Sequence, residues 1–172
     1  MNLLACKVSN ANVYVNGVDL LGRAEEVEFP QLKHKMQEHK GLGMAGSAEF
    51  EAGMDKLEAK ITWASVYGDV APAVFNGLAP AAIMIRGYQQ EFSSGGAVNE
   101  LPVVAMLSGV FKESPKLSVK HQESQSAESA LSVYSYQLLI GGIPQLQIDV
   151  LANIYIVQGI DVLANFRQIL GG

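Results

Sequence analysis

A strict alternation of apolar and polar residues, ending at the only tryptophan, constrains the fold more than any other stretch. Leu57, Ala59, Ile61 and Trp63 alternate with Lys56, Glu58, Lys60 and Thr62. Successive side chains of a strand point to opposite faces, so this period of two is typical of a sheet with one buried and one wet face. We therefore expect a strand over residues 56–66, with the apolar set in the core.

The segment before this strand is rich in glycine and yet carries large apolar side chains. Four glycines punctuate residues 33–54, and glycine costs backbone entropy on folding. The apolar residues of the segment are Met36, Leu42, Met44, Phe50 and Met54. Two interpretations stay open: a protruding arm over about residues 33–54 that a partner subunit orders, or an ordinary long hairpin loop folded back on its own core.

The composition favours a protein that buries surface between subunits. The chain has 172 residues, which suits a single domain with a sizeable core. It is 49% hydrophobic and only 17% charged, whereas about 25% is usual in soluble domains. The net charge of −5 and the lack of a basic run argue against a polyanion-binding protein.

Targeting and redox signals are weak. Cys6 is the only cysteine, so no internal disulfide is possible and nothing indicates an oxidising compartment. No apolar run approaches the roughly 18 residues of a membrane helix, and none follows Lys7 with signal-peptide length. We expect a chain that is cytosolic when made, without stable membrane insertion.

Strand and turn signals are spread along the chain. Asn16-Gly17 favours a tight turn, within a hairpin from residue 12 to about 38. In that hairpin Val27 and Phe29 alternate with Glu26 and Glu28. The other expected strands cover residues 83–90, 102–111, 117–122, 130–140, 146–150 and 154–156, with turns or loops at 92–99, 123–128 and 141–142. On residues 130–140 we expect Tyr134 and Tyr136 to share one face.

Two short helices complete the pattern. Residues 70–77 carry a proline near the first turn and apolar positions on one side, so we expect a helix on the outside of the sheet with Phe75 buried. Residues 160–170 place apolar side chains at helical spacing before Gly171-Gly172. The strand count and short spacing predict a mainly β fold, an antiparallel β-sandwich or barrel with one or two short helices.

A strand–turn pattern occurs near both ends of the chain. Residues 12–21 read Asn-Val-Tyr-Val-Asn-Gly-Val-Asp-Leu-Leu, and residues 153–163 read Asn-Ile-Tyr-Ile-Val-Gln-Gly-Ile-Asp-Val-Leu. We interpret this as a reused strand–turn unit or a coincidence of composition. Asp19 and Asp161 form a carboxylate pair only if the two units meet in space. The favoured role of each is to bind the backbone of its own turn.

No motif of an enzyme or a cofactor site is present. His34, His39 and His121 lack the spacing of metal ligands and have no second cysteine to join them. The three glycines of residues 41–46 superficially match a dinucleotide fingerprint, but they do not follow a buried parallel strand. We expect no catalytic residue, no metal and no cofactor.

Several short motifs stand in a specific order and spacing. They are Asn16-Gly17, Pro30 after a Val-Glu-Phe strand, Gly43-Met44, Gly53-Met-Asp-Lys-Leu57-Glu58, and Gly159-Ile-Asp161-Val-Leu163 with Arg167 and Leu170-Gly171. Over essentially the whole chain they resemble the major tail tube protein of contractile-tailed phages. The tubes of R-type pyocins look like the same family, and the type VI secretion tube protein looks like a distant cousin. Gln158 departs from the asparagine that is common in this family before the terminal glycine.

The resemblance implies a structural protein. Its relatives form hexameric rings that close a larger ring barrel and stack into a hollow conduit for DNA inside a sheath. The implied partners are further copies of the chain, the sheath protein, the tail terminator, and the baseplate and tape-measure proteins, in a virion assembled in the host cytoplasm. DNA would pass without specific binding. The alternatives are a bacteriocin or type VI-like secretion tube, a small-ligand-binding β-barrel, and an enzyme on a β-sandwich.

The tube interpretation assigns two surfaces. The inter-subunit arm comprises Met36, Leu42, Gly43, Met44, Phe50 and Met54. The candidate lumen-facing residues are Glu26, Glu28, Lys56, Glu58, Lys60, Ser118, Lys120 and Gln122. From parts of these faces we expect a polar lumen, mixed in sign but net acidic. Alternation tells which residues share a face. It does not tell whether that face sees the lumen or the outer solvent, nor which ring interface the arm serves.

Overall fold

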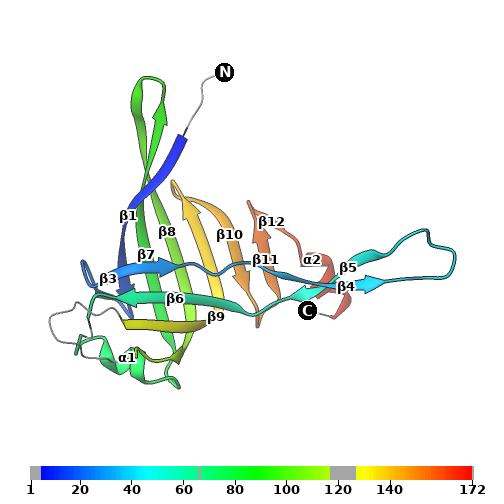
Figure 1. Cartoon of the computed structure of the whole chain (residues 1–172), viewed down its shortest axis with the longest axis horizontal. Helices are drawn as coiled ribbons and strands as arrows, with labels where there is room; N and C mark the ends of the chain where they lie inside the picture. The colour runs from blue at the N-terminus through cyan, green and yellow to red at the C-terminus, as the bar shows by residue number, and fades with distance from the viewer. Residues whose placement is uncertain (1–4, 66, 117–126, 172) are drawn as a thin grey trace.

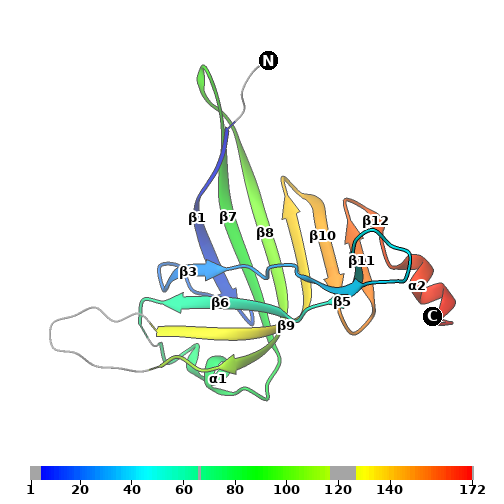
Figure 2. The ribbon, with the colours of Figure 1, turned by 45° about the vertical axis from the view of Figure 1, so that its right-hand side comes forward.

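A single 10-stranded antiparallel sheet bends over into two layers of crossing strands (Figures 1 and 2). The computed structural model describes residues 5–65, 67–116 and 127–171. The first layer holds, in spatial order, β12 (Ile160–Asp161), β11 (Ile154–Val157), β10 (Ile143–Asp149), β9 (Ala127–Ile140), β8 (Gly96–Glu113), β7 (Ala81–Ser93), β1 (Ala5–Val15) and β2 (Val18–Asp19). The second layer adds β3 (Ala24–Glu28) and β6 (Leu57–Trp63) to the first part of β9 and the end of β8. The predicted mainly β, antiparallel class is confirmed.

A bulge between β8 and β9 carries these two strands from one layer into the other. Ser108 pairs with Ser135, but the next residue, Gly109, pairs with Val133, so Tyr134 has no partner on β8. Such an extra residue bends a strand and increases its twist. A Cβ at Gly109 would overlap the carbonyl oxygen of Ser132 and lie 2.9 Å from its carbonyl carbon. The bend therefore requires glycine at this position.

The bulge also reverses the alternation of side chains along β9. Tyr136 is buried at 4% exposure, whereas Tyr134 is 40% exposed. The prediction that these two tyrosines share a face is wrong, because the extra residue shifts the pattern by one position. Val133 and Tyr136 both belong to the core instead.

The core lies between the two layers and rests on the alternation in β6. Leu57, Ala59, Ile61 and Trp63 are all exposed by 3% or less, as the sequence predicts. They pack with Ile83, Ile85, Leu107 and Leu131 in one cluster. The Trp63 indole N–H donates a hydrogen bond of 2.8 Å to the Ser129 hydroxyl. This bond satisfies two polar groups that would be costly to bury alone.

Three two-residue turns have positive φ at both positions. They are Asn16-Gly17 at 50° and 82°, Gly141-Gly142 at 59° and 81°, and Gln158-Gly159 at 48° and 83°. The turn prediction at Asn16-Gly17 is confirmed, but the hairpin ends at β2, because β3 pairs with β6 and not with its sequence neighbour. The first and third turns join β1 to β2 and β11 to β12, so the sequence echo is a reused strand–turn–strand unit.

The hairpin of β7 and β8 is longer than the sequence predicts. The sequence predicts an exposed turn over residues 92–99, but Phe92 still pairs with Ala97 and only Ser94-Gly95 form the turn. The Asn99 side chain donates to a Glu91 carboxylate oxygen across the strands at 3.2 Å. Cross-strand contacts of this kind support pairing in polar, glycine-rich residues. The hairpin extends beyond the layer, beside the start of β1 (Figure 1).

The two helices are short. α1 (Ala71–Phe75) buries Val74 at 4% exposure, but Phe75 is 46% exposed, so the prediction that Phe75 is buried is wrong. A one-turn helix places only one of these two neighbours against the sheet. α2 (Ala164–Ile169) begins later than expected because residues 160–161 form β12. Neither helix is long and apolar enough to cross a membrane.

The glycine at the bulge yields the first prediction. Gly109→Ala should lower the free energy of unfolding by about 1–3 kcal/mol or more, because the new methyl group overlaps the backbone of β9. Gly87→Ala in the neighbouring strand is the matched control, since its Cβ would find ordinary contacts at 3.5 Å. Urea denaturation of the free subunit measures both. Equal effects of the two substitutions would contradict the role of Gly109.

Helix α1 yields the second prediction. Val74→Ala should cost about 1–3 kcal/mol of unfolding free energy, because it leaves a cavity under the helix. Phe75→Ala should cost clearly less than the roughly 3–5 kcal/mol of a buried phenylalanine. Thermal and chemical denaturation of both variants provide the comparison. A larger loss for Phe75→Ala than for Val74→Ala would show that the phenylalanine, not the valine, anchors the helix.

Candidate assembly and channel surfaces

The segment at residues 33–54 forms a hairpin with a sheet of its own. β4 (His34–His39) and β5 (Ala48–Met54) pair with each other and, among the described strands, with no others. The hairpin continues β3 and β6 and projects away from the two layers (Figure 1). Its base is closed by a 2.8 Å hydrogen bond from the Asp55 backbone N–H to the Lys33 carbonyl. We call residues 33–54 the arm.

The apolar side chains of the arm are exposed, with one exception. Met36, Met44 and Phe50 are 52%, 45% and 58% exposed, and Leu42 at the tip is completely so. The chain turns beside it at Gly43, which has a φ of 86°. Met54 differs, because it is partly buried and packs against the core cluster. Four of the five apolar side chains assigned to the arm are therefore available to a partner.

A groove lies between the base of the arm and the last strands of the chain. Its volume is about 700 Å³. Apolar side chains dominate the lining, among them Met54, Ile148, Tyr155, Val162 and Phe166. The groove is open to solvent, so it adds apolar surface next to the arm.

The C-terminal segment, residues 151–170, exposes a third set of apolar side chains, which the sequence analysis did not assign to a surface. Leu151, Ile160, Ile169 and Leu170 are 77%, 71%, 84% and 67% exposed. The apolar residues at helical spacing over 160–170 do not form a buried face, because α2 has no buried residue. Arg167 holds the segment in place through an ion pair with Asp161 and a 2.8 Å hydrogen bond to the Asn153 carbonyl.

The outward face of the second layer is charged, and we call it the charged face. Glu28 lies opposite Lys60 on β3 and β6, and Glu26 lies opposite Thr62. Glu58 also belongs to β6 and points the same way by alternation. The structure thus brings together five candidate lumen residues, Glu26, Glu28, Lys56, Glu58 and Lys60. The other three, Ser118, Lys120 and Gln122, lie outside the described residues.

Ion pairs link the charges of this face. The Glu58 carboxylate accepts contacts from the ammonium groups of Lys112 at 2.7 Å and Lys56 at 2.6 Å. Hydrogen bonds from Lys112 and Lys56 lower the pKa of Glu58 to about 2. Lys60 contacts Glu128 at 2.9 Å, and this carboxylate raises the pKa of Lys60.

Lys112, Glu113 and Glu128 belong to the charged face but were missed in the sequence. Lys112 is the extra residue of a second bulge, because Phe111 pairs with Leu131 and Glu113 already pairs with Ala130. Sequence alternation does not reveal a bulge. Glu128 ended a polar stretch that we expected to be a loop, but it is the second residue of β9. Nothing in the sequence around these three residues distinguishes them from ordinary charged residues on a protein surface.

The aspartates and histidines considered in the sequence analysis are not brought together into a site. Asp19 and Asp161 lie at opposite ends of the sheet, so they form no carboxylate pair; each accepts a backbone hydrogen bond of 3.1 Å in its own turn. His34 and His39 lie in the arm. Among the described residues, no group of three or more His, Cys, Asp or Glu side chains is placed to hold a metal ion.

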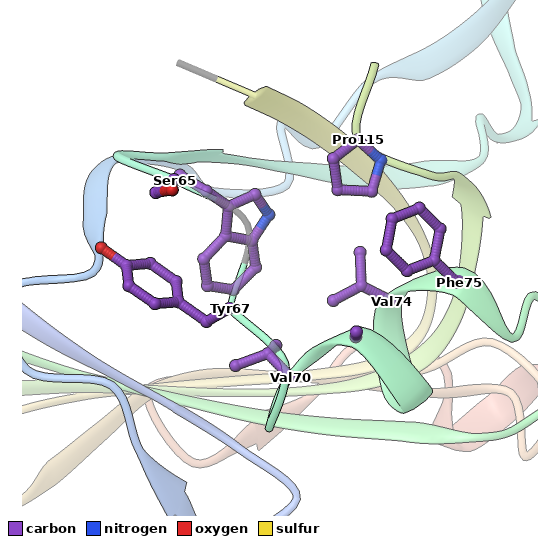
Figure 3. Close-up of a pocket in the computed structure, with 8 residues that line it drawn as sticks. Ser65, Tyr67, Val70, Val74, Phe75 and Pro115 are labelled. Carbon is purple, nitrogen blue, oxygen red and sulfur yellow. The ribbon is translucent and has the colours of Figure 1, made fainter. Parts of the chain in front are cut away.

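A pocket beside α1 is too small for an organic ligand. Figure 3 shows Tyr67, Val74, Phe75 and Pro115 around it. Its volume of about 10 Å³ is close to the room of one water molecule. The pocket therefore gives no support to a ligand-carrying β-barrel.

One curated relative is similar over nearly its whole length. The tail tube protein of Escherichia phage P2 is 27% identical to this chain over 171 residues, which cover 96% of each protein.

Two solved structures share the fold. A chain of the PVC sheath–tube complex, an extracellular contractile injection system in its extended state, has a TM-score of 0.50 at 12% identity and covers 76% of this chain and 86% of that chain. A chain of the PVC sheath/tube terminator in the extended state has a TM-score of 0.51 at 12% identity and covers 78% and 94%. At such identity the likeness shows the fold alone.

A model of one protein family matches residues 5–171 and describes phage tail tube protein FII. The match spans both layers, the arm and the C-terminal segment. The chain belongs to the phage tail tube protein FII family and is a structural subunit of a tail tube.

Proposed function

We propose that this tail tube protein forms hexameric rings that stack into the hollow inner tube of a contractile phage tail, through which DNA passes. The observation that carries this proposal is the projecting arm with four exposed apolar side chains. Burying each of them against another copy is worth about 1.5–3 kcal/mol. Repeated at every subunit of a ring, that gain favours assembly strongly.

The open edges of the sheet support closure into a ring. β12 ends the first layer on one side, and β2 covers only Tyr14 and Val15 of β1 on the other. The Val13 carbonyl accepts a further hydrogen bond of 2.9 Å from the Leu20 N–H, and the part of β1 before it has an unpaired edge in the described chain. Exposed edges invite pairing with another chain. In the proposed ring, neighbouring copies pair these edges and form one larger barrel.

We assign the charged face to the wall of the channel. It is polar, mixed in sign and richer in carboxylates than in lysines, which suits DNA that must pass without binding. The exposed apolar surfaces of the arm, the groove and the C-terminal segment are left for contacts between copies. This division gives each surface of the subunit one role.

The proposed partners follow from a tail tube. They are the sheath protein outside, the tail terminator at one end, and the baseplate and tape-measure proteins at the other end and in the channel. The two solved structures come from a sheath–tube complex and a sheath/tube terminator. We place the assembled protein in the virion, after assembly in the host cytoplasm. The role is mechanical and requires no catalytic group or cofactor.

The alternative is the tube of a bacteriocin or a secretion machine. Such tubes use the same subunit fold, as the likeness to an extracellular injection system illustrates. The relative from phage P2 favours a phage tail. Purified particles that contain packaged DNA support the phage assignment, and particles without a capsid support the alternative.

The arm gives the third prediction. Leu42→Ser together with Met44→Ser should abolish tubes at concentrations where the natural protein polymerises. The unfolding free energy of the subunit should change by less than about 0.5 kcal/mol, because both side chains are exposed. Electron microscopy and sedimentation report assembly. Met54→Ser is the contrast, since its loss should destabilise the subunit itself. Normal tubes from the double variant would refute the role of the arm.

The charged face gives the fourth prediction. The variant Glu28→Cys is made together with Cys6→Ser, because Cys6 is exposed. In long tubes the new cysteine should react slowly with a bulky maleimide, whereas its reaction rate with a small maleimide should stay the same as in free subunits. Free subunits should react rapidly with both reagents. The variant Arg86→Cys is the control, because Arg86 is exposed on the first layer. It reports how much tube assembly slows the bulky reagent at a position outside the charged face. If the ratio of the bulky-reagent rate to the small-reagent rate at Glu28→Cys is the same in tubes and in free subunits, the charged face does not line the channel.

A further inference from the structure

Three lysines of the charged face, Lys56, Lys60 and Lys112, each contact a carboxylate. Lys56 and Lys112 both meet the same Oε1 atom of Glu58, at 2.6 Å and 2.7 Å. Lys60 meets Glu128 Oε1 at 2.9 Å. Two carboxylates thus engage three ammonium groups, of which one lies on β6, one directly before β6 and one on β8.

The fold builds these pairs by leaving room between the strands. β9 lies between β8, which carries Lys112, and β6, which carries Glu58. On its outward side β9 offers only the small side chains of Ala130 and Ser132 between them. Ala130 is only 3% exposed although it points outward by alternation. The ion pair between Lys112 and Glu58 therefore spans β9.

The lysines have a reason to be present beside an acidic surface. Glu26, Glu28, Glu58, Glu113 and Glu128 give five carboxylates, against three lysines. Like charges on neighbouring strands destabilise a sheet, so interspersed cations relieve that repulsion. Glu28 and Glu113 both interact with Lys60 through space. Free lysines, however, are the groups that bind the phosphates of nucleic acids.

We propose that Glu58 and Glu128 are positioning residues that mask the three lysines of the charged face, so that the face supports a folded acidic sheet without binding a phosphate backbone. The inference rests on the proposed function in one respect, namely that the passing polyanion is DNA. The low pKa of Glu58 keeps its carboxylate ionised throughout the neutral and mildly acidic range. The masking of Lys56 and Lys112 by Glu58 then persists throughout that pH range.

The test measures DNA binding by the free subunit. Glu58→Gln with Glu128→Gln keeps both side-chain shapes and frees the three lysines. We expect at least about a tenfold gain in affinity for a fluorescent duplex at about 0.01 M salt, where screening is weak. The logarithm of the affinity should fall with the logarithm of salt with a slope near −2.7, about 0.9 for each of three phosphates contacted. Fluorescence anisotropy measures both quantities.

A matched control separates masking from net charge. Glu49→Gln with Glu91→Gln also removes two negative charges, but from the arm and from the β7–β8 hairpin, away from the charged face. This variant should bind DNA no better than the natural protein. An equal gain in the control, or no gain in Glu58→Gln with Glu128→Gln, overturns the proposal. Adding Lys112→Gln to the gaining variant should lower its affinity and its salt slope.

A loss of folding, or a wrong placement of the charged face in the tube, can be told apart from a failure of the masking. If the double variant does not fold by circular dichroism, Glu128→Gln alone frees Lys60 and should show a smaller gain with a slope near −0.9; no gain there overturns the proposal. Because free subunits are used, the outcome does not depend on tube assembly. Failure of the labelling test at Glu28 overturns the channel placement, whereas failure of the binding test overturns the masking.

Discussion

The close approach of Gly109 to the backbone of Ser132 is the constraint on which the rest of the subunit depends. Without a side chain there, β8 and β9 bulge and cross from one layer into the other. The crossing puts β6 over Ile83, Ile85 and Leu107, and so creates the core. It also separates a charged outer face on the second layer from a far less charged one on the first. Two faces of different chemistry are what a channel wall and an outer surface require.

Local signals in the sequence predict the parts of the fold that depend on local physics. The period of two in β6 predicts which of its side chains are buried, and Asn16-Gly17 and Gly141-Gly142 predict turns with positive φ. The same alternation correctly groups Glu58 and Lys60 on one face. These features need only the pleat of a strand or the freedom of glycine and asparagine. Neither depends on distant parts of the chain.

The parts that the sequence does not predict depend on distant pairings. Nothing near Tyr134 marks it as the extra residue of a bulge, because the cause is Gly109 on another strand. The pairing of β3 with β6 skips the whole arm, so the hairpin expected up to residue 38 is wrong. Lys112 reaches Glu58 only because a second bulge turns it outward. Register shifts of one residue thus account for the misplaced Tyr134 and the missed Lys112.

The distribution of exposed apolar side chains limits how copies can meet. Leu42 lies at the tip of the arm, and Leu151 and Ile169 lie in the C-terminal segment. Leu78 follows α1, the helix that lies at the opposite end of the molecule from the arm (Figure 1). A two-fold contact pairs a patch with itself and would leave the remaining patches in water. A head-to-tail contact pairs unlike patches, and it generates either a closed ring or an open filament. A subunit with several separated apolar patches is therefore suited to both directions of growth in a tube, around the ring and along its axis.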